Sequence, residues 1–99
     1  MYVVMRQFRI RDGTDVNEVI RKINARIVPA LKAIDGFQSY RLLDLRDGTY
    51  GSFSSYRTEQ GASEANRVAV DAAGIILDDA VQFSSIKVWK TLLRVNAGE

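Results

Sequence analysis

The hydrophobic and polar positions along the chain predict four β-strands. Positions 2–11 and 37–46 are rich in β-branched, aromatic and long side chains, and an Asp-Gly pair follows each of them. Aspartate and glycine at such a boundary favour a tight turn. Positions 49–56 therefore predict a third strand, paired antiparallel with the second across its Asp-Gly turn. Positions 81–95 predict a long final strand.

The segment between the first two strands has the spacing of an amphipathic helix over about residues 16–34. Asp15 with Glu18 three residues later fits a capping box at its start, and Thr14 is the rival cap. Pro29 lies inside the helix and is expected to bend it, because its ring crowds the carbonyl four residues earlier. Apolar positions that recur every three or four residues form one stripe for the core: Val16, Val19, Ile20, Ile23, Ile27, Ala30, Leu31 and Ile34.

A second helix is predicted from a Thr58 cap to about residue 77. Gly61 and Gly74 weaken it by roughly 1 kcal/mol each relative to alanine. Its inner positions are mostly small side chains, so it can lie close to a sheet or leave space for a ligand. These positions are Ala62, Ala65, Val68, Ala69, Ala72 and Ile76.

The resulting order of elements, β-α-β-β-α-β, is that of the ferredoxin-like fold. We therefore predict an α+β protein with an antiparallel sheet and both helices on one of its faces. A chain of 99 residues has the length of a single core, so residues 1–99 are interpreted as one domain.

Both faces of the predicted sheet carry apolar side chains, although two helices can cover only one face. The first strand carries Val4, Arg6 and Phe8 on one face, with Val3 and Met5 on the other. The last strand is expected to do the same, with Phe83 and Trp89 on one face and Ile86 and Val88 on the other. A large exposed apolar surface is unusual for a monomer. A homodimer that packs sheet against sheet is therefore predicted.

Composition narrows the chemistry that the chain can perform. Hydrophobic residues make up 46% and charged residues 26%, as in an ordinary globular protein, and neither cysteine nor histidine is present. Disulfides, thiol nucleophiles, Cys/His metal sites and Ser-His-Asp triads are therefore excluded, and no metal is expected. No apolar run is long enough to span a membrane and Arg6 interrupts any signal-peptide core, so a cytoplasmic location is expected.

The RNA-recognition motif shares this order of elements and is an alternative. Its third strand carries a basic-Gly-aromatic-Gly-aromatic run on which bases stack. Residues 50–53 read Tyr-Gly-Ser-Phe, with serine in the place of the second aromatic, and residues 47–49 read Asp-Gly-Thr, without a leading basic residue. The formal charge of +2 is also too small for a nucleic-acid surface, so nucleic-acid binding is not predicted.

Several short strings, spread over nearly the whole chain, resemble a known family when they are taken together. Residues 28–32 read Val-Pro-Ala-Leu-Lys and lead into Asp-Gly-Phe at 35–37 and Tyr-Arg-Leu-Leu at 40–43. Glu-Ala-Asn-Arg at 64–67 and Val-Trp at 88–89 follow. This combination is similar to the antibiotic biosynthesis monooxygenase-like family. The resemblance implies a dimeric α+β barrel with a small-molecule pocket between the sheet and helices of each protomer. It also implies one of the family's activities: oxygenation of aromatic polyketides without metal or flavin, quinol oxygenation, or haem degradation.

The resemblance also shows where this chain departs from the family. Haem-degrading members carry an asparagine on the first strand, and a tryptophan and an iron-binding histidine on or after the second helix. The corresponding positions here are Arg6, Ala65 and a Gly-Ile pair at 74–75, so haem degradation is not expected and no cofactor is predicted. Polyketide-oxidising members use asparagine, tryptophan and arginine. Asn66, Trp89 and Arg6 supply these residue types without matching a motif, so the catalytic residues are left unassigned.

The candidate ligand-binding residues are Arg6, Phe8, Tyr40, Asn66 and Trp89. Arg6, flanked on its strand face by Phe8, would give a fixed positive charge to a substrate carbanion or phenolate. Asn66 would hold a substrate oxygen, and Tyr40 would donate a hydrogen bond to a carbonyl. Each also has a structural interpretation: a salt-bridged surface arginine, a solvated asparagine, cross-strand tyrosine packing, and a tryptophan in the core or a dimer interface.

The leading hypothesis is a cofactor-independent monooxygenase-like enzyme that acts on an aromatic or quinol-type small molecule. The alternative is a non-catalytic small-molecule-binding or structural homodimer of the same fold. A cavity on the order of a few hundred Å³ lined by Arg6 and aromatic side chains would favour the enzyme. A closed, alanine-filled gap between helices and sheet would favour the alternative.

Overall fold

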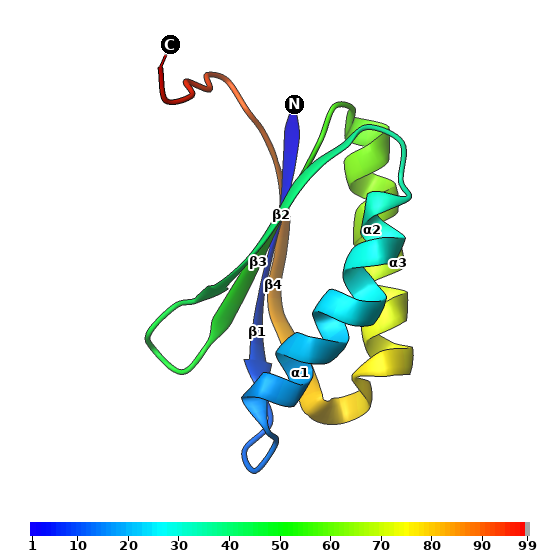
Figure 1. Ribbon diagram of the computed structural model, residues 1–99, viewed down its shortest axis with the longest axis vertical. Helices are drawn as coiled ribbons and strands as arrows, with labels where there is room; N and C mark the ends of the chain where they lie inside the picture. Colours follow the sequence, from blue (N-terminus) through cyan, green and yellow to red (C-terminus); the bar gives the residue numbers. More distant parts are fainter. Residues whose placement is uncertain (99) are drawn as a thin grey trace.

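The computed structural model describes residues 1–98, and Figure 1 shows them as a sheet covered by helices on one side. The strands are β1 (Tyr2–Ile10), β2 (Phe37–Asp44), β3 (Tyr50–Tyr56) and β4 (Val81–Lys90). The helical segments are α1 (Val16–Lys22), the π-helical η1 (Ile23–Ile27), α2 (Val28–Lys32), α3 (Glu59–Ile76) and the 3-10 turn η2 (Asp78–Ala80). None of the helices in this part of the chain is long and apolar enough to cross a membrane.

The four strands form one antiparallel sheet in the order β2-β3-β1-β4, so β1 and β3 occupy its centre. The helical layer formed by α1, η1, α2 and α3 lies on one face of this sheet, and the chain leaves the other face open (Figure 1). This is the ferredoxin-like arrangement. The predicted fold class and the placement of both helices on one face are confirmed.

The first helix begins as expected but without the full capping box. Asp15 is the N-cap, and its side chain accepts a hydrogen bond from the Asn17 N–H at 3.0 Å. Glu18 does not return to the cap, because its carboxylate pairs with Arg21 one turn further on. The predicted start of the helix is therefore confirmed, while the side-chain partner of Glu18 is different.

The distortion expected at Pro29 takes the form of a π-helical segment. The Val28 N–H donates to the Ile23 carbonyl, five residues back, at the end of η1. Pro29 has no N–H to offer to the Ala25 carbonyl, and its ring would crowd that oxygen in a regular α-helix. A widened turn directly before the proline relieves this conflict, and such turns often occur at functional sites.

The core lies between the helices and the inner face of the sheet. Its buried apolar side chains are Val4, Phe8, Val19, Ile23, Ile27, Leu31, Tyr56, Ala62, Ala65, Ala69, Ala73 and Leu77. Along α3 the buried residues are alanines and Gly61, so this helix can approach the sheet closely. Ala72 and Ile76, predicted for the inner face, are only partly buried. Ala73 and Leu77 take the innermost positions instead.

The last strand is shorter than predicted. β4 ends at Lys90 and not at position 95, because β1 begins at Tyr2 and offers no partner further along. The final link of the ladder is a hydrogen bond of 2.8 Å from the Thr91 N–H to the Met1 carbonyl. The segment beyond leaves the sheet (Figure 1), and Leu92 and Leu93 are 90% and 82% exposed.

A β-bulge in β4 changes the face on which its side chains lie. The register with β1 shifts so that Phe8 pairs with Phe83, and Ser84 has no partner in the ladder. Phe83 consequently packs against Phe8 on the helix side, whereas Trp89 pairs with Val3 on the open side. The prediction that Phe83 and Trp89 share a face is wrong, because one extra residue reverses the alternation of the strand.

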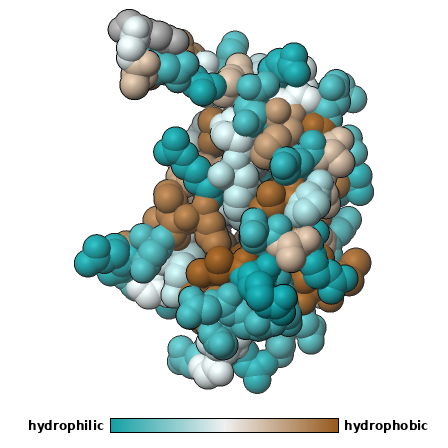
Figure 2. All heavy atoms as spheres, in the orientation of Figure 1, coloured by the Kyte–Doolittle hydropathy of each residue, from teal (hydrophilic) through white to brown (hydrophobic). Residues whose placement is uncertain are grey.

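The open face of the sheet keeps large apolar side chains near solvent. Leu43 is 38% exposed and Trp89 is 46% exposed, with the Trp89 ring centroid 6.3 Å from that of Phe53. A hollow of about 470 Å³ lies on this face, lined in part by Val3, Leu43, Phe53 and Leu93. Apolar atoms gather in the concave side of the molecule, between the C-terminal segment and the β2–β3 hairpin (Figure 2). This chain alone does not bury them.

The two glycines of α3 are expected to respond oppositely to alanine. A Cβ on Gly74 would meet no heavy atom within 4 Å, so Gly74→Ala should raise the free energy of unfolding by about 0.5–1 kcal/mol through helix propensity. A Cβ on Gly61 would lie 3.0 Å from the Asp35 carbonyl oxygen and 3.2 Å from Thr58 Oγ1, so Gly61→Ala should lower it. Urea unfolding measures both changes. Equal stabilisation by the two substitutions would contradict this packing.

Candidate functional site

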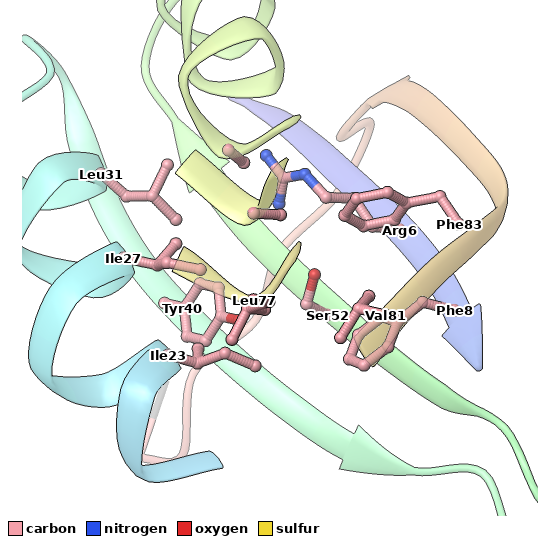
Figure 3. Close-up of a pocket in the computed structure, with 12 residues that line it drawn as sticks. Arg6, Phe8, Ile23, Ile27, Leu31, Tyr40, Ser52, Leu77, Val81 and Phe83 are labelled. Carbon is pink, nitrogen blue, oxygen red and sulfur yellow. The ribbon is translucent and has the colours of Figure 1, made fainter. Parts of the chain in front are cut away.

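A small cavity lies between the sheet and the helices (Figure 3). Its volume is about 30 Å³, enough for about two water molecules and too small for an aromatic ring. Most of the side chains in its wall are apolar, and three are polar. The wall consists of Arg6, Phe8, Ile23, Ile27, Leu31, Tyr40, Ser52, Ala69, Ala73, Leu77, Val81 and Phe83.

Arg6 brings a positive charge into this apolar space. Val4, Arg6 and Phe8 alternate along β1 toward the helices, and Arg6 is only 2% exposed. Its guanidinium donates hydrogen bonds to Ser54 Oγ at 3.4 Å and to the Ala65 carbonyl at 3.3 Å, while its Nε has no partner. Arg6 forms no ion pair with any residue of the described chain. The charge is therefore held in place without being neutralised.

Burial changes the ionisation of the polar groups that line the cavity. It lowers the pKa of the Arg6 guanidinium, although arginine remains cationic at physiological pH. It raises the pKa of the Tyr40 hydroxyl, against the opposing influence of the Ser52 hydroxyl and the Arg6 charge. Tyr40 therefore presents a protonated hydroxyl beside a cation, and both groups can donate hydrogen bonds to an acceptor.

Two further buried polar atoms have no hydrogen-bond partner within residues 1–98: Tyr56 Oη, which the Arg6 charge influences, and Asn66 Oδ1 on α3. Burial raises the pKa of Tyr56, and the nearby Ser54 hydroxyl and Arg6 charge oppose that rise. Asn66 follows Ala65, whose carbonyl accepts the hydrogen bond from Arg6. Buried polar atoms without partners destabilise a fold. Neither residue lines the cavity, so the hydrogen-bonding groups of the cavity itself are those of Arg6, Tyr40 and Ser52.

A second, larger hollow adjoins the cavity from the surface. Its volume is about 360 Å³, and it is lined by Ile20, Arg21, Ile23, Asn24, Val28, Tyr40 and Leu42. Ile23 and Tyr40 line both spaces, so their side chains form the wall between them. The hollow alone has the volume of a small-ligand site. We call these two spaces the inner cavity and the outer hollow.

Three of the five predicted site residues come together, and two lie elsewhere. Arg6 and Phe8 of β1 and Tyr40 of β2 line the inner cavity (Figure 3). Asn66 lies on α3 outside this lining, and Trp89 lies on the open face of the sheet. The interpretation of Trp89 as an interface residue fits this position better than a place in the pocket.

Ser52 and Phe83 line the cavity but were not singled out by sequence reasoning. Ser52 pairs with Arg6 across β1 and β3, so it lies on the same face of the sheet. No local motif gives that register, since the two strands are far apart in the sequence. Phe83 reaches the cavity only because of the β4 bulge, which the alternation of residue types does not reveal.

The site does not fit a metal or a haem. Within the described residues no group of three or more His, Cys, Asp or Glu side chains could hold a metal ion. The sequence lacks histidine and cysteine, which supply the protein ligand of most haem irons. A cavity of about 30 Å³ is also far smaller than a porphyrin.

No protein-family model and no curated protein matches the sequence. Solved structures do match it. SnoaB, a cofactor-independent oxygenase from Streptomyces nogalater, gives a TM-score of 0.71 at 15% identity, over 99% of this chain and 97% of that chain. A variant of MhuD with two manganese protoporphyrin IX molecules bound per active site gives 0.72 at 17% identity, over 98% and 100% of the two chains. An antibiotic biosynthesis monooxygenase gives 0.67 at 11% identity, over 94% and 100%.

These likenesses extend over nearly the whole of each chain, and the sequences share few identical residues. They therefore concern the arrangement of the backbone. The resemblance stated from the sequence is confirmed at this level: the chain has the ferredoxin-like α+β fold of the antibiotic biosynthesis monooxygenase-like proteins.

Proposed function

We propose that residues 1–99 form one antibiotic biosynthesis monooxygenase-like domain, which oxygenates an aromatic or quinol-type small molecule without a cofactor. The observation that carries the proposal is the unneutralised Arg6 guanidinium in an apolar cavity, beside the hydroxyls of Tyr40 and Ser52. Fixed donors in such surroundings stabilise negative charge on a substrate, because little water screens them. The likeness of the fold to the cofactor-independent oxygenase SnoaB supports the same reaction class.

The proposed reaction needs no external electron donor. A CH₂ group conjugated with an aromatic ketone, as in an anthrone, loses a proton to solvent before the compound binds, and the carbon of the resulting enolate then reacts with O₂. The carbon gives up four electrons, one oxygen atom becomes a new carbonyl, and the other leaves as water with both hydrogens. Arg6 and Tyr40 would stabilise the enolate oxygen by charge and by hydrogen bonding. The protein's contribution is then to hold the oxyanion while carbon reacts.

We also propose that two copies of the chain associate through the open face of the sheet. Leu43, Phe53 and Trp89 on this face, and Leu93 beyond β4, offer apolar area near solvent. Burial of such area contributes about 25 cal/mol per Å². A second copy with the same face would cover it by two-fold symmetry, the commonest arrangement of homodimers.

The size of the inner cavity favours a second candidate, a non-catalytic ligand-binding or structural homodimer. Ala69 and Ala73 close the cavity from α3 and leave about 30 Å³. The lining contains Arg6 and three aromatic rings, which favours the oxygenase. The small volume favours the non-catalytic candidate. Oxygen chemistry has to be measured to separate them.

Oxygen uptake tests the proposed function. Purified protein is added to a panel of hydroxynaphthoquinones and anthrones in an oxygen electrode, and the rate is compared with that of each compound alone. We expect at least one compound to be oxygenated faster with protein. We expect Arg6→Met to lower the added rate by about 100-fold or more, as loss of one oxyanion donor does elsewhere.

The matched control is Arg9→Met, on the same strand but exposed, which should keep the wild-type rate. If no compound shows uptake above its spontaneous rate, the enzyme proposal is overturned and the non-catalytic candidate stands. Equal rates for the Arg6 and Arg9 variants would remove the role given to Arg6.

A further inference from the structure

The inner cavity and the outer hollow differ sharply in chemistry and size. The inner cavity holds the Arg6 guanidinium and has room for one or two atoms of the size of water oxygen, at about 30 Å³. The outer hollow offers about 360 Å³ and is lined by apolar side chains such as Ile20, Val28 and Leu42, together with Asn24 and with Arg21, whose charge is paired with Glu18. Figure 3 shows Tyr40 and Ile23, the shared wall, lying across from Arg6. One space therefore suits a charged oxygen, and the other suits a ring.

The two spaces also lack any group that could accept a proton from a ligand. Among the described residues that line them there is no carboxylate, and the sequence has no histidine. Burial raises the pKa of Tyr40, which keeps its hydroxyl protonated and a donor. A neutral phenol or enol would find no base here, whereas an oxygen that is already ionised would find a cation and donors.

The Arg6 guanidinium can donate further hydrogen bonds to such an oxygen. Its two hydrogen bonds, at 3.3 and 3.4 Å, are long for a charged donor, and its Nε has no partner. Leaving a buried guanidinium in this condition costs free energy, and an anionic ligand would offset that cost. The ionised oxygen of the ligand would take the position that a carboxylate takes in an ordinary arginine ion pair.

We propose that this site, the one used in the proposed function, binds its ligand as an aromatic oxyanion, with the ionised oxygen in the inner cavity at Arg6 and the ring in the outer hollow. The oxygen reaches Arg6 between Ile23 and Tyr40, whose side chains move apart to admit it, while the ring stays in the outer hollow. The site thus selects phenols and enols that ionise near neutral pH. It discriminates against the same compounds when the oxygen is alkylated.

The ionisation of a coloured ligand tests this proposal without any turnover. 4-Nitrophenol, which ionises near neutral pH to a yellow anion, is titrated with pH under argon, alone and with saturating protein, and the visible band of its anion is followed. The wild-type protein should lower the apparent pKa of the ligand by about one unit or more, which is a preference for the anion of about tenfold or more. The O-methyl ether should bind at least about tenfold more weakly than the anion.

Two variants identify the source of this selectivity. Arg6→Met should abolish the shift in the apparent pKa of the ligand. The variant should bind the O-methyl ether and the ionised ligand with equal affinity. Arg9→Met, which removes an exposed charge on the same strand outside both spaces, should keep the shift. If Arg6→Met does not fold, Arg6→Lys, which retains the charge, should still lower the apparent pKa of the ligand.

Each outcome of the titration decides the proposal. A shift that is absent, upward, or lost in Arg9→Met but kept in Arg6→Met overturns it, and so does an ether that binds wild-type protein as tightly as the anion. The measurement needs no oxygen, so its result is independent of the uptake experiment. Anion selectivity without oxygen uptake would reject the oxygenase and leave an oxyanion-binding protein.

Discussion

Trp89→Arg will convert the proposed homodimer into an 11.1 kDa species at micromolar concentration, while the chain stays folded. Trp89 is 46% exposed on the open face and takes no part in the buried core, so its loss leaves the fold intact. Buried tryptophans at the centre of an interface contribute about 2 kcal/mol or more each. Two-fold symmetry removes two of them, so dissociation should become about a thousandfold easier. Sedimentation velocity with wild type and variant side by side measures the change.

A matched control separates this interface from the rest of the surface. Val70 on α3 is 39% exposed, close to the value for Trp89, but lies in the helical layer. Val70→Arg should leave the sedimentation coefficient of the dimer unchanged. A wild-type protein that sediments only as a monomer would refute the dimer, and equal dissociation by both substitutions would place the interface elsewhere.

Arg6→Met will make the protein more stable and less able to bind an anion. The guanidinium is buried without an ion pair in the described chain, and its two hydrogen bonds are long. A methionine of similar length would fill the same apolar surroundings with no charge to desolvate. We expect the free energy of unfolding to rise by about 1–3 kcal/mol. A gain in stability when a functional group is removed is expected where a site trades stability for binding.

Chemical unfolding of the same preparation used for ligand binding measures this change. Arg9→Met, on the same strand but exposed, should change stability by less than about 0.5 kcal/mol. A loss of stability in Arg6→Met would mean that Ser54 and Ala65 depend on the guanidinium for the fold itself. The buried charge would then be structural.

The order of the elements could be predicted because each boundary carries a local signal. Asp15 and Thr58 cap their helices with side-chain hydrogen bonds, as expected. Gly36 and Gly48 adopt φ values of +84° and +87° after their aspartates, which only glycine reaches easily. These signals depend on neighbours in the sequence, and they are sufficient to order strands and helices.

The parts that could not be predicted depend on contacts between distant residues. The bulge at Ser84 exists only in the pairing of β4 with β1, and it separates Phe83 from Trp89. The volume of the inner cavity depends on how closely Ala69 and Ala73 approach the sheet, which composition does not determine. Arg6, Phe8 and Tyr40 could be chosen from strand alternation and side-chain chemistry. That these three side chains share one cavity depends on strand pairing and on the packing of the helices against the sheet, which the sequence pattern does not determine.

The β4 bulge has a thermodynamic consequence. The alternation of side chains between the two faces of the sheet reverses at Ser84. As a result, β4 places Phe83 in the wall of the inner cavity and Trp89 in the proposed interface. A compound that fits one association state better than the other must then alter self-association, and self-association must alter its affinity by the same factor. The apparent dissociation constant of such a compound would then change with protein concentration.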